Sequence, residues 1–299
     1  MNSTLFNGFT VHDIERAGPR LHARRGGSGP PLLLLHGHPQ THAMWHRVAP
    51  ALARRFTVVA ADLRGYGDSA RVAPHADHAD HTAYSKRRMA LDMLGLMQSL
   101  GFERFAVLAH DRGARVAHRL ALDHPQAVSR LMLLDIAPTL AMYEATTQAF
   151  ARAYWHWFFL IQPAPLPERL IEADPVAYLR EVMGRRHAGL SVFAPEALAE
   201  YERCIAMPGT AASICEDYRA SAGIDLEHDR VDRDAGRRLA PPLRVLWGAH
   251  GAVGRCFDVL PLWSAAAASV SGRALDCGHY IAEEAPDELL GEVFDFFKE

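Results

Sequence analysis

Short apolar runs alternate with amphipathic segments through the first half of the chain. Runs without polar alternation, such as Leu32–Leu35 and residues 57–61, are typical of strands buried on both faces of a parallel sheet. The segments 43–54 and 84–100 carry apolar residues on one helical face. Residues 8–26 alternate weakly, which indicates an N-terminal hairpin. The pattern predicts an α/β fold with a mostly parallel sheet flanked by helices and a site at the carboxyl ends of its strands.

The alternation of strands and helices stops after Pro138. Residues 139–240 contain aromatic-rich helical segments and a proline-rich link, without a clear buried strand. The strand pattern returns at residues 243–247, and apolar positions from Leu289 to Phe297 indicate a last helix. We therefore expect an α/β core formed by residues 1–138 and 241–299, with a helical cap inserted at 139–240.

Composition excludes several classes of function. The chain has 299 residues, a net charge of −3 and no basic stripe, so nucleic acid is not an expected partner. No apolar run approaches the roughly 20 residues that span a bilayer, and no secretory signal begins the chain. The cysteines show neither CxxC nor framework spacing, which favours reduced thiols and a cytoplasmic location.

The segment 105–123 has the layout of a nucleophile elbow. An apolar strand ends at Ala109, a sharp turn follows, and a helix begins after Gly113. Small residues at 109 and 113 let the strand and the helix approach closely. The exposed apex of such a turn is residue 111, and here it is an aspartate. A carboxylate in this position favours displacement at a saturated carbon over ordinary ester cleavage.

Further polar residues follow other predicted strands. Asp135 comes directly after the strand that succeeds the elbow, and His279 lies near the end of the chain after a predicted last strand. Together with Asp111 they would form a nucleophile–His–acid triad in which Asp135 orients His279. The loop after residue 247 is another common place for the acid, but it has no carboxylate until Asp258, which favours Asp135.

These motifs resemble the α/β-hydrolase superfamily and, within it, the fluoroacetate (haloacetate) dehalogenases. The His-Gly-x-Pro turn at 36–39 and Asp-x-Arg-Gly-x-Gly-x-Ser at 62–69 are typical of the superfamily. The dehalogenase resemblance depends on His-Asp-Arg-Gly-x-Arg at 110–115, His-Trp-Phe-Phe at 156–159 and Glu-Asp-Tyr-Arg at 216–219. It covers nearly the whole chain. Two positions depart from the family pattern: Ala109 stands where glycine is usual, and His38 where an apolar residue is expected.

The resemblance implies an activity and a role for each site residue. It implies hydrolysis of fluoroacetate or chloroacetate to glycolate and halide, without a cofactor or metal, by a homodimer. Asp111 would be the nucleophile, His279 the base that activates water, and Asp135 its partner. The remaining implied roles are substrate-carboxylate binding by Arg112 and Arg115, halide binding by His156, Trp157 and Tyr218, and oxyanion-hole donation by the backbone amides of His38 and Arg112.

The chemistry of these residue types fits the implied reaction. Attack by the Asp111 carboxylate expels halide and leaves an ester, which water activated by His279 then hydrolyses. Positions 112 and 115 lie on one face of a helix turn, so both arginines can face an anionic substrate. An imidazole, an indole and a phenol from the cap would stabilise the departing halide.

Other interpretations stay open at this point. An epoxide hydrolase shares the elbow aspartate but needs two cap tyrosines, of which Tyr218 is one candidate. A haloalkane dehalogenase resembles this layout with tryptophan at position 112, and a non-catalytic carboxylate-binding protein would not need the triad. Each residue taken alone also has a structural interpretation, as a helix-start acid, a surface cation or a packing aromatic. The histidines of 74–81 fit a solvated loop better than a metal site.

Overall fold

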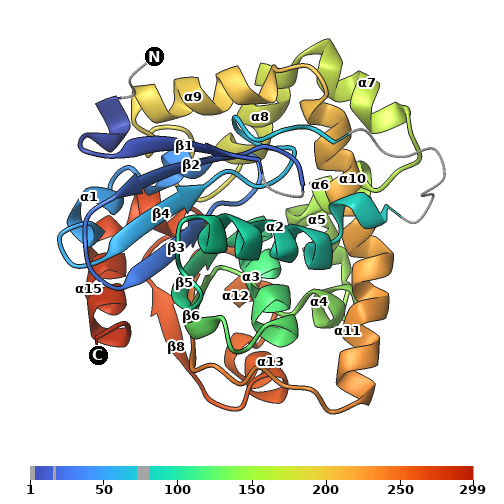
Figure 1. The fold of residues 1–299 in the computed structure, drawn as a ribbon. Coiled ribbons are helices and arrows are strands. Elements are labelled where there is room, and N and C mark those ends of the chain that lie inside the picture. Colours follow the sequence, from blue (N-terminus) through green and yellow to red (C-terminus); the bar gives the residue numbers. More distant parts are fainter. Residues whose placement is uncertain (1–3, 16–17, 73–80, 299) are drawn as a thin grey trace.

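An eight-stranded sheet forms the centre of the computed structural model, which describes residues 4–15, 18–72 and 81–298 (Figure 1). Its strand order is β1-β2-β4-β3-β5-β6-β7-β8. β1 pairs with β2 and β2 with β4 in antiparallel fashion, and all other pairs are parallel. The strands are β1 (Thr10–Ile14), β2 (Leu21–Gly26), β3 (Pro31–Leu35), β4 (Thr57–Ala61), β5 (Phe105–His110), β6 (Val128–Leu134), β7 (Leu243–Gly248) and β8 (Val270–Leu275). The predicted fold class and the N-terminal hairpin are confirmed.

Burial explains why the central strands lack alternation. Leu32 to Leu35 in β3 and Val58 to Ala61 in β4 are fully buried, because helices cover both faces of the sheet there. β1 lies at the edge of the sheet and shows an alternation of half-buried and exposed residues instead. The continuous apolar runs therefore identified the strands that carry the site at their carboxyl ends.

Helices of the core lie on the two faces of the sheet. In Figure 1, α2 (Lys86–Ser99) and α3 (Asp111–Asp123) lie in front of the sheet, and α1 (Ala49–Leu52) and α15 (Pro286–Phe296) lie at its left. The Phe56 ring, just before β4, stacks on Phe294 of α15, with ring centroids 6.4 Å apart. The other core helices are α12 (Ala252–Cys256), α13 (Val259–Ala266) and α14 (Ile281–Glu284).

The single helix expected over 43–54 is wrong. A short 3-10 helix covers His42–Trp45, and α1 begins only at Ala49. Pro50 occupies the first turn of α1, where its missing N–H needs no partner; one turn further into a continuous helix it would remove a hydrogen bond. The apolar positions nonetheless pack as expected, since Trp45, Val48 and Leu52 are fully buried.

The chain between β6 and β7 is helical. It contains α4 (Thr139–Glu144), α5 (Gln148–Ala153), α6 (Trp155–Leu160), α7 (Leu166–Ala173), α8 (Pro175–Gly184), α9 (Pro195–Ile205), α10 (Thr210–Ala222) and α11 (Ile224–Asp234). In Figure 1, α8 and α9 lie across the top of the view, and α10 and α11 run down its right side. The division into core and cap stays a prediction, but the elements follow its proposed boundaries.

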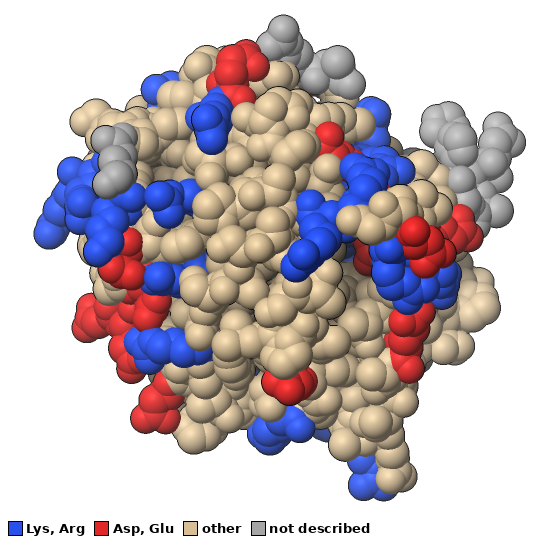
Figure 2. All heavy atoms as spheres, turned by 90° about the horizontal axis from the view of Figure 1, so that it is seen from below, with Lys and Arg blue, Asp and Glu red and all other residues tan. Residues whose placement is uncertain are grey.

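Helix length and the distribution of surface charge can be described for the residues that the structure places. Within the described ranges, no helix is both long and apolar enough to cross a membrane. On the face shown in Figure 2, Lys and Arg lie mixed with Asp and Glu around a largely uncharged centre. Mixed charge of this kind does not form the single-sign stripe that binds a phosphate backbone.

A buried glutamate links the segment after His279 to helix α9. Glu283 of α14 has no exposed surface, and its Oε1 accepts hydrogen bonds from Tyr201 Oη of α9 at 2.5 Å and from Gln40 Nε2 at 3.2 Å. Burial raises the pKa of Glu283 to about 7, although the Tyr201 hydrogen bond and Arg47 act in the opposite direction. The folded chain therefore binds a proton here more tightly than the unfolded chain does.

This pKa shift predicts a pH-dependent effect of Glu283→Gln on stability. A folded-state pKa raised from 4.5 to about 7 means that stability falls as pH rises through this window. The variant removes the ionisation, so its unfolding free energy should match wild type near pH 4.5 and exceed it at pH 8 by about 3 kcal/mol. Urea denaturation at both pH values checks this. An equal difference at the two pH values would contradict it.

Candidate active site

The predicted elbow is present between β5 and α3. Asp111 is the first residue of α3 and has φ +44°, a left-handed conformation that is rare for a residue with a side chain. Neighbouring glycines make room for it. A Cβ atom at Gly37 would lie 2.4 Å from the Asp111 Cβ, and one at Gly113 would lie 2.4 Å from the His36 carbonyl oxygen. Only glycine permits these close approaches.

The Asp111 carboxylate is buried yet ionised. Asp111 is 3% exposed, and its Oδ1 accepts a hydrogen bond from the His38 backbone N–H at 3.0 Å. Burial alone would raise the pKa of Asp111, but the imidazole rings of His279 and His110 and the guanidinium groups of Arg112 and Arg115 outweigh burial and hold this pKa well below its usual range. The carboxylate is therefore available as a nucleophile at neutral pH.

His279 and Asp135 are in direct contact, as predicted. His279 Nδ1 lies 2.5 Å from Asp135 Oδ2, and the other carboxylate oxygen, Oδ1, accepts the backbone N–H of Gly248 at 3.0 Å. These bonds place the Nδ1 proton towards Asp135 and leave Nε2 of the ring as the acceptor that a general base requires. Asp258, the alternative considered for the acid, instead precedes α13 as its N-cap residue.

Arg112 is held by a second carboxylate. Its Nε and Nη2 donate to Asp217 Oδ2 and Oδ1, each at 2.8 Å, and Nη2 also donates to Ser221 Oγ at 2.6 Å. Lys86 Nζ and Tyr66 Oη bind the same carboxylate. Arg112 Nη1 is buried and has no hydrogen-bond partner among the described residues. Most of this guanidinium is thus committed to the protein, and one N–H group stays available.

Arg115 lies buried without an acidic partner in the described chain. Its Nη1 donates to Thr139 Oγ1 at 2.7 Å and to the Ala137 carbonyl oxygen at 3.2 Å, both neutral acceptors. Its Nε is buried and unpaired within the described ranges. Burial, and next the charge of Arg112, lower the pKa of Arg115. The nearby Asp111 acts in the opposite direction and raises this pKa. A buried cation that forms no ion pair and shares only the charge of the nucleophile is a natural site for a further anion.

The three cap residues predicted to bind halide gather on the same side of the site. His156 and Trp157 lie on α6 and Tyr218 on α10, and Trp157 and Tyr218 have no exposed surface. Trp157 Nε1 and Tyr218 Oη are buried donors without a partner in the part of the chain that is described. The guanidinium of Arg115 stacks 4.7 Å from the Trp157 ring, and that of Arg112 lies 4.0 Å from the Tyr218 ring. Unpaired buried donors of this kind are expected where a ligand completes their hydrogen bonds.

A cavity of about 420 Å³ leads to His279 and His156. Its wall carries positive charge and, among its described residues, no aspartate or glutamate. The basic residues that line it, besides His156 and His279, are Arg152, Arg185, Arg186, His187, His250 and Arg255. Cationic walls raise the local concentration of small anions.

Several residues of this site carried no role in the sequence prediction. Asp217 stood between two residues of a recognised motif, and its function depends on Arg112, which lies 105 positions earlier in the chain. Tyr143 of α4 is half-buried, but its hydroxyl is buried without a partner among the residues described, and its ring lies 5.1 Å from that of Trp157. Tyr178 and Arg186 come from α8 and the turn after it. No local pattern distinguishes such residues, because their partners are distant in sequence.

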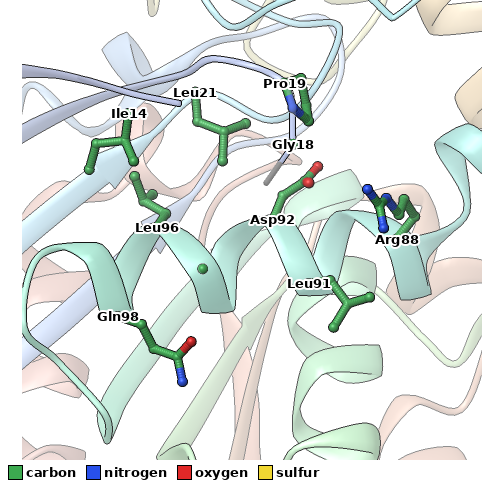
Figure 3. A pocket seen from close by; sticks show the side chains of 10 residues that line it. Ile14, Gly18, Pro19, Leu21, Arg88, Leu91, Asp92, Leu96 and Gln98 are labelled. Atoms are coloured by element: carbon green, nitrogen blue, oxygen red, sulfur yellow. The ribbon is translucent and has the colours of Figure 1, made fainter. Parts of the chain in front are cut away.

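A separate cavity of about 300 Å³ lies between the N-terminal hairpin and α2 (Figure 3). It contains none of the predicted site residues. Its carboxylate, Asp92, already accepts two hydrogen bonds of 2.7 Å from Arg64, so the acid of this cavity is paired. The cavity therefore does not compete with the elbow as the reactive centre.

One group of described side chains has the composition of a metal site. His22, His42 and Asp62 each place a ligand atom within 4.8 Å of the others. Asp62 Oδ1 already accepts the backbone N–H of His42 at 2.7 Å and bonds its ring at 2.9 Å, which accounts for the arrangement without an ion. Of the predicted loop 74–81, only His81 lies within the described residues, and its Nδ1 lies 2.8 Å from Glu216 Oε2.

Comparisons with known proteins agree with this geometry. A family model for the α/β-hydrolase fold matches residues 30–286. A fluoroacetate dehalogenase from Burkholderia sp. is 43% identical over 99% of this chain and 96% of its own. A soluble epoxide hydrolase from Corynebacterium sp. (strain C12) is 35% identical over 96% and 97% of the two chains. Among solved structures, a proposed α/β hydrolase from Nostoc sp. PCC 7120 has a TM-score of 0.95 and 52% identity, covering 98% and 99%.

The contact between Arg112 and Asp217 predicts a large stability cost for Asp217→Asn. The substitution leaves the buried charges of Arg112 and Lys86 without their shared carboxylate, which should lower the unfolding free energy by about 3–5 kcal/mol. Chemical denaturation measures the loss. Asp234→Asn is the matched control, because that side chain is 72% exposed, and its midpoint should not change. Equal midpoints for the two variants would show that Asp217 is not needed for charge balance.

Proposed function

Because the chain belongs to the α/β-hydrolase fold family, we propose that it hydrolyses haloacetates, converting fluoroacetate or chloroacetate and water into glycolate and halide. Hydrolase chemistry is supported by the family and by the relatives of two activities. The dehalogenase assignment is the finer step, and it depends on the charge of the substrate.

The buried, acid-free Arg115 carries the proposal. Its charge acts on the pKa of Asp111, its guanidinium bonds only neutral acceptors in the described chain, and its Nε is unpaired there. A substrate carboxylate would compensate this charge and accept the free N–H groups of Arg112 and Arg115, each worth roughly 1.5–3 kcal/mol. These bonds would offset the repulsion between an anionic substrate and an anionic nucleophile. A neutral substrate has no such use for them.

The first chemical step is displacement at carbon. A carboxylate oxygen of Asp111 forms a bond to the halogen-bearing carbon while the carbon–halogen bond breaks, and halide leaves with the bonding electrons. Trp157 Nε1–H, Tyr218 Oη–H and the His156 ring supply hydrogen bonds to the charge that develops on the halogen. The product of this step is an ester between Asp111 and glycolate.

The second step regenerates the nucleophile. His279 Nε2 takes a proton from water, and the resulting hydroxide attacks the ester carbonyl carbon of Asp111. The oxyanion forms where the His38 backbone N–H already meets Asp111 Oδ1, and the Arg112 N–H is proposed as the second donor. Collapse breaks the acyl–oxygen bond, and glycolate takes the proton from His279. The Asp111 carboxyl group, which now holds one oxygen from water, releases its own proton to solvent and becomes a carboxylate again, so each cycle yields one proton with the halide.

Epoxide hydrolysis is the second candidate, and one observation favours it. Tyr143 and Tyr218 both have buried hydroxyl groups without a partner among described residues, and a pair of phenols is what opening an epoxide requires. The same triad would serve. The acid-free Arg115 and the basic access cavity favour the anionic substrate instead. A non-catalytic carboxylate-binding protein would not need the contact between His279 and Asp135.

The proposal includes the setting of the reaction. The substrate is a small haloacid, no cofactor takes part, and the enzyme acts as a cytoplasmic homodimer. These expectations come from the sequence and from its resemblance to the dehalogenases.

Halide release measured side by side tests the proposal. Wild-type protein is incubated with fluoro-, chloro- and bromoacetate, and free halide is measured, while styrene oxide is followed in parallel for diol formation. The proposal expects halide and glycolate from at least one haloacetate. Opening of styrene oxide by a protein that is inert to all three haloacetates would assign the second candidate function instead.

Substitution of the base should trap the ester. In His279→Asn the first step proceeds, but no group activates water, so a carboxymethyl ester accumulates on the peptide that contains Asp111. Mass spectrometry of the digested protein after reaction with chloroacetate detects it. Asp111→Asn is the control and should show neither the adduct nor halide release. A full halide yield from Asp111→Asn would refute the nucleophile assignment.

Removal of the Arg115 charge should separate binding from stability. Arg115→Met is expected to raise KM for chloroacetate about ten- to hundredfold, because a charge-assisted bond to the carboxylate is lost. The same change removes a buried cation that forms no ion pair within the described residues, so the unfolding midpoint should stay equal or rise. Arg104→Met, at an exposed position before β5, is the control. An unchanged KM with reduced stability would assign Arg115 a purely structural role.

A further inference from the structure

The His38 side chain departs from the family pattern and lies inside the site. The residue is 3% exposed, and its Nε2 lies 3.1 Å from Tyr178 Oη of α8. Its other ring nitrogen, Nδ1, is buried without a hydrogen-bond partner among the described residues. An apolar side chain at this position would have left no such group unpaired.

The surroundings of His38 are the residues proposed to bind halide. Its ring stacks on that of His156, with centroids 6.0 Å apart and an angle of 18° between the planes. It meets the Tyr218 ring edge-on at 5.5 Å. The imidazole thus occupies the wall of the leaving-group side of the site, between the core turn and the cap.

Covalent geometry places the two ring nitrogens on different sides. Nδ1 is the nitrogen nearer to the backbone of the same residue, and the His38 backbone N–H bonds Asp111 Oδ1 at 3.0 Å. Nε2 lies at the far end of the ring, where it meets Tyr178. The unpaired nitrogen is therefore the one nearer to the backbone N–H that bonds Asp111.

Tyr178 determines which nitrogen carries the proton. Burial lowers the pKa of His38 to about 3, so the ring is neutral at neutral pH and has one N–H group. Within the described chain, His38 Nε2 is the hydrogen-bond partner of the Tyr178 hydroxyl. A phenol that donates to Nε2 satisfies both atoms, and the imidazole proton is then on Nδ1. In the opposite tautomer, the phenol proton would have no acceptor and Nδ1 would present a lone pair to an anion.

We propose that His38 Nδ1–H is a further hydrogen-bond donor to the departing halide and that Tyr178 is the positioning residue that fixes this tautomer. The inference rests on the proposed dehalogenase function and names a determinant of its leaving-group preference. Fluoride concentrates its charge on a small atom and is the strongest hydrogen-bond acceptor among the halides. The additional donor therefore lowers the barrier for breaking a carbon–fluorine bond more than that for a carbon–bromine bond.

Three substitutions of His38 test whether the hydrogen-bond donor must stand at the position of Nδ1. An asparagine amide nitrogen replaces Nδ1 and a glutamine amide nitrogen replaces Nε2, whereas phenylalanine supplies neither. His38→Phe and His38→Gln should lower kcat on fluoroacetate about tenfold and kcat on bromoacetate less than about threefold, with KM little changed. His38→Asn should recover most of the fluoroacetate rate. His46→Phe, a histidine of the same segment that bonds the Ala43 carbonyl oxygen, is the control.

The role of Tyr178 has a readout that does not depend on activity. In wild-type protein labelled with ¹⁵N-histidine, the His38 ring should show the Nδ1–H tautomer. In Tyr178→Phe it should shift towards the Nε2–H tautomer, and the fluoroacetate rate should fall together with this shift. An unchanged tautomer in Tyr178→Phe would overturn the positioning role.

The failure of the inference is distinguishable from that of the proposed function. If wild-type protein releases no halide from any haloacetate, the proposed function fails, and the inference fails with it. If wild-type protein releases halide and His38→Phe affects fluoroacetate and bromoacetate equally, or neither, the inference alone is overturned. Equal rates of His38→Asn and His38→Gln on fluoroacetate would also overturn it.

Discussion

Charge compensation in a buried space is the constraint on which this site depends. Asp111, Asp135 and Asp217 are each at most 3% exposed, and an isolated buried carboxylate costs several kcal/mol. The structure places a basic side chain against two of them: His279 against Asp135, and Arg112 with Lys86 against Asp217. Asp111 alone has no dedicated partner of this kind. It shares the field of several cations, and so it is both ionised and free to react.

The same balance explains why the two arginines differ. The charge of Arg112 is neutralised by Asp217, and most of its N–H donors bond to the protein. Arg112 therefore affects the shape of the pocket more than the charge of the pocket. Arg115 bonds neutral oxygens, and its charge is left for another anion. A pair that looks equivalent in the sequence, three residues apart on one helix turn, therefore divides into a scaffold and a binding group. The division depends on a helix of the cap, because Asp217 belongs to α10.

This dependence on distant partners limits what the sequence predicts. The elbow, the strands and the positions of Asp135 and His279 follow from local patterns, since a turn or the end of a strand needs only its neighbours. The helix expected over 43–54 was wrong because that prediction followed the apolar spacing and disregarded Pro50, which the chain accommodates in the first turn of a separate helix. The partners of Arg112 and His38 lie 105 and 140 positions away, and no spacing within one segment reveals such contacts.

The triad alone does not decide between a haloacid and an epoxide, because attack by an aspartate and hydrolysis of its ester are common to both reactions. The two reactions differ in the hydrogen-bond donors that contact the leaving atom and in the protein groups that bind the rest of the substrate. Unpaired phenols at Tyr143 and Tyr218 suit an oxygen that stays attached, whereas indole, imidazole and phenol donors around one point suit an ion that departs. The proposal of a charged substrate rests on Arg115, a buried cation that forms no ion pair within the described residues. A buried cation without an ion-paired acid is costly to the protein, and this cost is the observation that supports the proposed anionic substrate over a neutral one.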